Sequence, residues 1–321
     1  MSRARHPVDN LSAISVFVRI GESPNLATAA RRLGLSPSGV SKALARLEER
    51  LGVRLVNRTT HNLSLTEEGA QYFARCQAIL AELEDAEAAL NRAGAAPKGR
   101  LRVLLPHGFG RKIVLPALAD FLDRYPRLRI DVELSDRPAN LAEEGIDVAV
   151  RVGEAPDQRV MAKTLCRMRY VICASPAYLR QHGEPKEPAE LATHRCLTLV
   201  RPHTGRYREW DIIEGAGDIV GTLNVNDIQG LVDAAIAGAG ILYATGYMIW
   251  EALLGGQLKV ILPQHGRAGP PLTALYLPNR HHSPRVGAFL EFLTQLVTAD
   301  PPWEQVLAQM SGPCVGGRPT P

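Results

Sequence analysis

The N-terminal part of the chain alternates between apolar stripes at helical spacing and short polar breaks. Leu11, Ile14 and Val18 recur at steps of three and four, with Phe17 beside them, which predicts an amphipathic helix. The polar segment 22–25 ends this pattern, and a second helix is predicted over 26–33. Gly34 follows it directly, and glycine readily adopts the left-handed conformation that closes many helices.

A third helix is predicted to begin after Ser36, which suits the N-cap, with Pro37 at its first position. Its apolar side chains form a single stripe: Val40, Leu44, Leu47 and Leu51. Helical rotation places small, polar and basic side chains on the opposite face: Ser38, Ser41, Lys42 and Ala45. Two short helices joined by a glycine turn, the second with such a face, predict a helix-turn-helix over 26–45.

Two short alternating segments follow, at 53–56 and 62–65, and they predict a hairpin wing around 57–61. The tip of this wing offers the guanidinium of Arg58 and the hydroxyls of Thr59 and Thr60. In a narrow minor groove, Arg58 would meet the most negative potential of the duplex. Each basic residue alone could equally be a solvated surface charge, but the combination of stripe, turn and wing favours DNA binding.

A long helix is predicted over 66–92. Its side chains at alternating steps of three and four nearly make a heptad seam: Phe73, Cys76, Leu80, Leu83, Glu87 and Leu90. The seam could pack on its own domain or against a second copy of the chain. We favour a dimerising linker helix over 67–93, between a DNA-binding domain at 1–66 and a flexible boundary at 93–99.

The rest of the chain alternates between strand and helix patterns, which predicts an α/β domain with parallel strands over 99–297. Strands are predicted at 100–105, 128–134, 146–152, 170–174, 196–200, 221–225, 241–243 and 272–276. Helices are predicted at 113–125, 141–144, 228–237 and 286–297. Residues 298–321 are expected to be a C-terminal tail.

Open parallel sheets bind ligands beyond the carboxyl ends of their strands, and this rule selects a set of candidate effector contacts. The candidates are Pro106, His107, Gly108, Phe109, Arg137, Arg151, Arg201, Arg206 and Asn226. Arginine forks and free amides at helix N-termini favour a small carboxylate. The alternative is that the arginines are solvated or paired with acidic neighbours such as Asp136, Glu144 or Asp147.

Charge adds an asymmetry to this pattern. Residues 1–62 carry ten lysines and arginines against four acidic residues, whereas residues 63–98 carry three against six. Since the 321-residue chain has a net charge of only +4, its positive charge is concentrated in the predicted helix-turn-helix segment. Such a local excess is expected of a protein that binds the phosphate backbone of double-stranded DNA.

The sequence lacks the motifs that mark the common enzyme and metal-binding classes. Glycine pairs at 108–110 and 215–217 fall short of a dinucleotide loop, and GxSxG, Walker and HExxH motifs are absent from the sequence. The adjacent His281 and His282 have no third ligand nearby, and the five cysteines show no CxxC pair. Cys166 and Cys173 could form a redox pair, although buried inert thiols are more common. We expect no enzyme activity, no metal and no cofactor.

The expected cellular location follows from the absence of targeting and membrane-spanning patterns in the sequence. The basic N-terminus is not followed by the apolar segment of a secretory signal, and no apolar stretch reaches the length of a membrane span. We therefore expect a cytoplasmic protein without a membrane partner.

Residues 9–93 closely resemble the N-terminal domain of LysR-type transcriptional regulators, above all in "NLATAARRLGLSPSGVSKALARLEERLGVRLVNRTTHNLSLTEEG". The segment "LSDRPANLAEEGIDVAVRVGE" is similar to the effector domain of a large subgroup of that family. The resemblance covers roughly residues 9–297. It implies that Pro37, Ser38, Ser41 and Lys42 face bases and phosphates, and that Arg58 occupies the wing position.

The resemblance also implies a fold and a set of partners. The fold is a winged helix-turn-helix and linker helix, followed by a two-lobed domain like that of periplasmic binding proteins. Lobe 1 is expected at about 99–167 and 270–297, and lobe 2 at about 168–269. The implied partners are promoter DNA, a small effector and a second copy in a homodimer or homotetramer, with RNA polymerase also possible.

Two other classes of function remain open. A ligand-binding transport protein would explain the two lobes, but it needs an export signal and leaves the basic N-terminal domain without a purpose. A sequence-neutral architectural DNA-binding protein would explain residues 1–62 but not the two-lobed domain. A regulator that combines both parts accounts for the whole chain.

Overall fold

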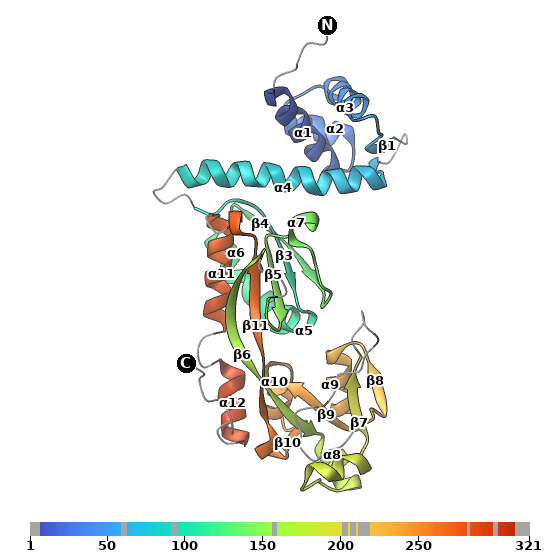
Figure 1. The fold of residues 1–321 in the computed structure, drawn as a ribbon, viewed down its shortest axis with the longest axis vertical. Coiled ribbons are helices and arrows are strands. Elements are labelled where there is room, and N and C mark those ends of the chain that lie inside the picture. The colour runs from blue at the N-terminus through green and yellow to red at the C-terminus, as the bar shows by residue number, and fades with distance from the viewer. Residues whose placement is uncertain are drawn as a thin grey trace.

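The computed structural model of the chain describes residues 7–58, 63–90, 96–155, 159–200, 205, 210, 219–280, 283–297 and 301–311. Figure 1 shows an elongated molecule in which a small helical domain lies on one side of a long helix and a two-lobed domain lies on the other. The DNA-binding candidates and the effector candidates are therefore in separate bodies, with the long helix between them.

The three predicted N-terminal helices are confirmed, as α1 (Pro7–Gly21), α2 (Leu26–Leu33) and α3 (Pro37–Leu51). Local signals set their ends. The Asn25 side chain accepts the Thr28 N–H to begin α2, and Gly34 closes it with φ 65°. The Ser36 side chain accepts the Gly39 N–H to begin α3.

The apolar stripe of α3 packs into the domain core through Val40, Leu44 and Leu47, together with Phe17 and Ile20 of α1. The predicted fourth member, Leu51, is 37% exposed. It is the last residue of α3, where the chain turns away at Gly52, so it lies beyond the packed part of the stripe.

The wing is formed by β1 (Val56–Arg58) and β2 (Leu63–Leu65), which pair antiparallel. The first strand begins later than predicted, at Val56 instead of Val53, and it includes Arg58. Directly before it, the Leu55 amide donates to the side chain of Glu48 and not to the opposite strand.

The long helix is α4 (Glu67–Leu90). Half of its predicted seam packs within its own domain: Cys76 is fully buried in the helical core, and Phe73 and Leu80 pack against that core. Phe73 meets the ring of Phe17 edge-on at 6.1 Å. Cys76 is therefore excluded from an intermolecular seam, while Phe73 and Leu80 are partly used within their own domain. Leu83 remains 42% exposed.

In the described part of the chain, the effector domain is built on one nine-stranded sheet in the order β4-β3-β5-β11-β6-β9-β7-β8, with β10 paired to β6. The strands are β3 (Gly99–Leu105), β4 (Leu128–Leu134), β5 (Val148–Val152), β6 (Met161–Ala174), β7 (Cys196–Leu199), β8 (Leu223–Val225), β9 (Ile241–Thr245), β10 (Lys259–Ile261) and β11 (Arg267–Tyr276).

The helical segments of this domain cover both faces of the sheet. They are α5 (His107–Phe109), the π-helix η1 (Gly110–Val114), α6 (Leu115–Arg124), α7 (Leu141–Glu144), α8 (Pro176–His182), the short η2 (Pro188–Thr193), α9 (Ile228–Ile236), α10 (Gly246–Leu254), the short η3 (Pro263–His265) and η4 (Pro278–Arg280), α11 (Pro284–Leu296) and α12 (Pro302–Ser311). Of these, α5, α8, α10, α12 and the short η2, η3 and η4 were not predicted.

Two long strands join the lobes. In lobe 1, β3 is parallel to β4 and β5, and in lobe 2, β7 is parallel to β8 and β9. The antiparallel strands β6 and β11 run through both lobes (Figure 1), and their register shifts between Ala268 and Pro271. Both strands are longer than the sequence predicted. A bulge weakens a ladder locally, so the chain crosses between the lobes at a weak point of the sheet.

Candidate DNA-binding surface and effector site

The predicted recognition residues lie on the solvent side of α3. Pro37, Ser38 and Lys42 are exposed, and Ser41 is half-buried. The hydroxyl of Ser38 lies 3.1 Å from that of the N-cap Ser36. Since the opposite face of α3 is fixed in the core, these side chains are held on a rigid helix.

The recognition helix, the wing and α4 meet at the backbone of Leu55, a junction that the sequence did not predict. Glu48 Oε1 accepts the Leu55 and Val56 amides at 2.9 and 3.2 Å, and the Leu55 carbonyl accepts the Thr66 N–H at 3.0 Å. A β-carbon at Gly69 would overlap that same carbonyl oxygen. The glycine in the first turn of α4 was the available signal.

Only the two strands of the wing lie within the described part of the structure. The Arg58 backbone pairs with Leu63 in the hairpin, whereas the Arg58 side chain and residues Thr59 and Thr60 lie outside the described part of the structure. Their predicted contacts with DNA therefore stay predictions.

In the effector domain, the segment after β3, which the sequence presented as a loop, forms the short helix α5 and reaches lobe 2. Gly108 is buried so closely that a β-carbon there would lie 2.5 Å from Met248 Sδ and 3.5 Å from Ile228 Cγ2. The ring of Phe109 meets that of Tyr247 edge-on at 5.9 Å. Pro106 is buried, and His107 is exposed. The carboxyl end of β3 thus lies at the contact between the lobes.

Asn226 lies just before α9, on the lobe 2 side of the same contact, because the first residue of α9, Ile228, faces Gly108. The amides at the start of α9 are partly used within the chain: the Asp227 carboxylate accepts the Gln229 and Gly230 N–H groups at 3.4 and 3.1 Å. This helix terminus therefore offers a ligand fewer free donors than its position alone suggests.

Arg151 and Thr273 lie directly opposite each other on β5 and β11. The Arg151 Nε and the Thr273 hydroxyl are both buried, and neither has a hydrogen-bond partner among the described residues. Buried polar groups are normally satisfied. The register of β3 on β5, Leu104 opposite Ala149, extends to place Arg151 beside Pro106, at the end of the sheet where the lobes meet.

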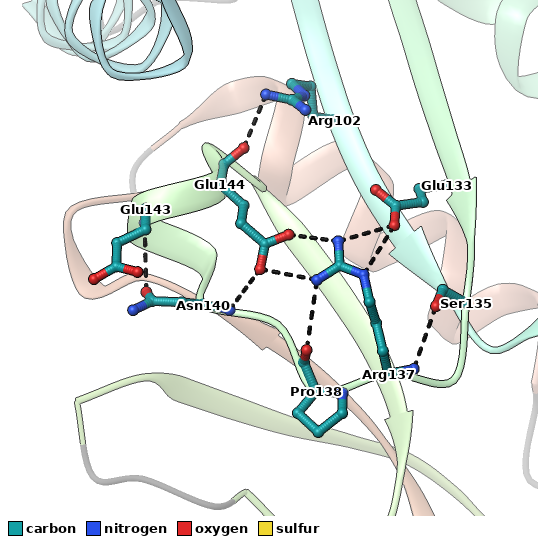
Figure 2. A network of polar contacts seen from close by, with 8 residues as sticks. All are labelled: Arg102, Glu133, Ser135, Arg137, Pro138, Asn140, Glu143 and Glu144. Carbon is teal, nitrogen blue, oxygen red and sulfur yellow. Dashed lines mark hydrogen bonds and ion pairs between the residues drawn. The ribbon is translucent and has the colours of Figure 1, made fainter. Parts of the chain in front are cut away.

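Arg137 forms ion pairs with acidic neighbours, which is the alternative to ligand binding that the sequence left open. Its guanidinium donates to Glu144 Oε1 at 2.9 Å and to Glu133 Oε1 at 2.9 Å. Figure 2 shows the side chain extending between these two carboxylates. The hydrogen bonds from Arg137 are the main reason that the pKa of Glu144 lies below its ordinary value of 4.5.

The same region touches the long helix. Asp147, another acidic partner considered from the sequence, is buried with Arg280 at 3.5 Å and Arg285 at 3.8 Å. Arg280 also donates to the carbonyl of Ala78 on α4 at 3.3 Å. The effector domain is thereby bonded to the helix that carries the DNA-binding domain.

The remaining sequence candidates form no redox or metal site in the described part of the chain. Arg201, Arg206 and the pair His281 and His282 lie outside the described residues. Cys166 and Cys173 are seven residues apart on β6, roughly 23 Å along a strand, so they cannot bond to each other. Among the described residues, no three His, Cys, Asp or Glu side chains gather at metal-binding distance, and no helix is long and apolar enough to cross a membrane.

Comparison with known protein families assigns both halves of the chain. Residues 11–70 match the model "Bacterial regulatory helix-turn-helix protein, lysR family", and residues 94–298 match the model "LysR substrate binding domain". The chain belongs to the LysR family. It is therefore a DNA-binding transcriptional regulator with a substrate-binding domain, and membership of this family also implies self-association.

Individual relatives agree with this assignment along nearly the whole chain. An HTH-type transcriptional repressor of Pseudomonas aeruginosa is 34% identical over 92% of this chain and 94% of its own length. The regulator CrgA of Neisseria meningitidis is 35% identical over 89% of this chain and 96% of its own length. Regulators of this family are generally not enzymes.

Solved structures match the fold. The structure of CrgA, described as a LysR-type transcriptional regulator, has a TM-score of 0.59 with 33% identity, and the match covers 89% of this chain and 98% of that one. An OxyR mutant of Corynebacterium glutamicum has a TM-score of 0.63 with 20% identity over 93% of this chain, which is a likeness of fold alone.

Proposed function

We propose that this LysR-family regulator reads a specific operator through Pro37, Ser38, Ser41 and Lys42 of α3, with Arg58, Thr59 and Thr60 on the wing. What supports this is the exposed polar and basic face of α3 on a domain with a local excess of positive charge. Phosphate contacts by basic side chains supply affinity, and contacts to base edges in the major groove supply sequence preference.

The oligomer is proposed to form through the outer face of α4. Ile79 is 47% exposed and Leu83 is 42% exposed on that helix, and neither faces the core of its own domain. A two-fold pair of winged helices would then read two half-sites of an interrupted inverted repeat.

The effector is proposed to be a small anion bound where the lobes meet, close to Pro106, Arg151, Thr273 and Asn226. The observation that favours this place is the pair of buried polar groups on Arg151 and Thr273 that lack partners within the described residues. A carboxylate could accept from both, which would remove the cost of leaving buried donors unsatisfied. Arg137 is less suited to the role because two carboxylates already hold it.

Binding between the lobes would bias their relative orientation and thereby the affinity for DNA. The protein is proposed to act in the cytoplasm, where it reaches the chromosome, and to affect transcription either by occluding or by contacting RNA polymerase. The experiment that tests the function is footprinting of the purified protein on the DNA upstream of its own gene. A protected inverted repeat, absent with random DNA of equal length, supports a regulator; equal binding to both would favour a sequence-neutral DNA-binding protein.

A further inference from the structure

The helix α12 lies beyond the segment that matches the substrate-binding family model, which ends at residue 298. It follows α11 of lobe 1 along the chain, but it lies beside lobe 2 (Figure 1). Trp303 and Leu307 are buried along its inner face, whereas Met310 near its end is 43% exposed. This helix is thus a packed part of the effector domain, where the sequence predicted only a tail.

Its docking partner is α10 in lobe 2. A β-carbon at Gly246, the first residue of α10, would overlap Leu307 Cδ1 and would lie 3.6 Å from Trp303 Cδ1. Only glycine permits this close approach. The ring of Trp303 also meets that of Tyr247 at 6.3 Å and 69°.

The contact continues from α10 into lobe 1. Tyr247 meets Phe109 edge-on at 5.9 Å and 88°, so three aromatic rings connect α12 through α10 to α5 of lobe 1. Edge-to-face rings at these distances attract each other. Next to them, Lys112 of lobe 1 pairs with Glu251 of α10 at 3.1 Å.

The same helix also lies near the crossing between the lobes. The thiol of Cys166, midway along β6, has its pKa raised to about 11, mainly by burial and further by the negative charge of Glu304 on α12. The helix also contacts η3, which leads directly into β11 just before its register shift. One crossing strand, β6, therefore has Glu304 of α12 near its Cys166, and the other, β11, follows directly from a segment that α12 contacts.

We propose that α12 is a strap: a third connection between the lobes that limits how far they move apart. Val297, at the end of α11, and Pro301, just before α12, are both buried. Since four residues of extended chain span at most about 14 Å, Val297 and Pro301 cannot move further apart than this. A movement of the lobes that would separate these two residues further must undock α12 from α10. The strap does not depend on which effector binds, but it restricts the lobe movement that an effector can cause.

Hydrogen–deuterium exchange of the full-length protein tests the strap. Two variants remove the docking from opposite sides: Leu307→Asp buries a charge against α10, and Gly246→Val pushes Leu307 away. Met310→Asp introduces the same charge on the exposed part of α12 and is the matched control. If α12 is a strap, both undocking variants exchange at least about tenfold faster at the crossing (164–168 and 267–272), while the control does not.

Faster exchange confined to α10, α12 and the residues 106–112 that touch α10 directly would overturn the proposal, because it would make α12 a local addition to lobe 2. Circular dichroism checks that each variant is folded. If Leu307→Asp unfolds the domain, the crossing segments 164–168 and 267–272 in Gly246→Val decide alone, since residues 106–112 also contact α10 directly.

Discussion

The Arg137 guanidinium binds the Glu144 carboxylate with two parallel hydrogen bonds, and this pair joins the loop after β4 to α7. The next residue, Gly145, lies against the long helix: a β-carbon there would be 3.5 Å from the carbonyl oxygen of Ala74 on α4. An arginine that the sequence suggested for an effector thus holds the element of lobe 1 that touches the DNA-binding half.

Glu144→Gln should lower the free energy of unfolding at neutral pH by about 0.5–1 kcal/mol, the scale of a partly exposed ion pair. Since the pKa of Glu144 is lowered in the folded state, its stabilisation is present above the ordinary value of 4.5 and is lost as the pH falls through the folded value. Urea unfolding at about pH 7 and about pH 3 measures this, and the wild type and the variant should converge at the lower pH.

The control for this prediction is Glu143→Gln, because Glu143 is not among the partners of Arg137 in Figure 2. It should change the unfolding midpoint little at either pH. An equal loss in both variants would mean that the Arg137–Glu144 pair contributes nothing specific.

Arg151→Met tests the effector site. The variant should lose its response to an anionic inducer while its affinity for DNA without inducer stays unchanged, because Arg151 is far from α3 along the chain and lies in the other domain. A reporter assay with titrated inducer measures the response. Arg180→Met, an exposed change on α8, is the matched control, and a normal response by Arg151→Met would remove this residue from the site.

Gly69→Ala tests the junction at Leu55. The added β-carbon would overlap a backbone carbonyl that cannot move independently, so we expect a loss of stability of about 1–3 kcal/mol and weaker operator binding through a displaced wing. Gly287→Ala in α11 has open space around its β-carbon and should be neutral or slightly stabilising. Thermal unfolding and gel-shift titration separate the two; equal behaviour would show that the junction tolerates a side chain.

Leu83→Asp tests self-association through α4. Leu83 is exposed on the single chain, so a charge there should leave the fold intact while shifting the protein toward monomer and weakening operator binding. Leu254→Asp, at a leucine that is 57% exposed on α10, is the control. Light scattering gives the mass, and an unaltered oligomer in Leu83→Asp would place the interface elsewhere.

Features specified by neighbouring residues could be predicted from the sequence. Asn25, Gly34 and Ser36 set the helix-turn-helix by capping bonds that reach at most five residues along the chain, and the stripe of α3 identified its buried face. The positions of β3, β4 and α9 followed in the same way, because each is bounded by local turn and cap residues.

Features that depend on contacts between distant parts of the chain could not be predicted from the sequence. Six of the nine residues of α10 are buried and Glu251 is its one charged residue, so its sequence has no extended polar face to mark it as a helix. Whether Arg137 binds a ligand or Glu144 depends on where α7 folds back, which no spacing specifies. The division of the α4 seam between its own core, at Cys76, and an exposed part, at Leu83, likewise depends on where α1 ends against it.

The central claim is that α3 docks on DNA with Lys42 at the interface, and the salt dependence of operator affinity tests it most directly. Binding of wild type, Lys42→Ala and the control Arg180→Ala is titrated at several salt concentrations. Lys42→Ala should weaken binding by about 1–3 kcal/mol if it touches a base, or lower the salt slope by about one if it touches a phosphate, while Arg180→Ala changes neither. An unchanged affinity together with an unchanged slope for Lys42→Ala would contradict this docking of α3.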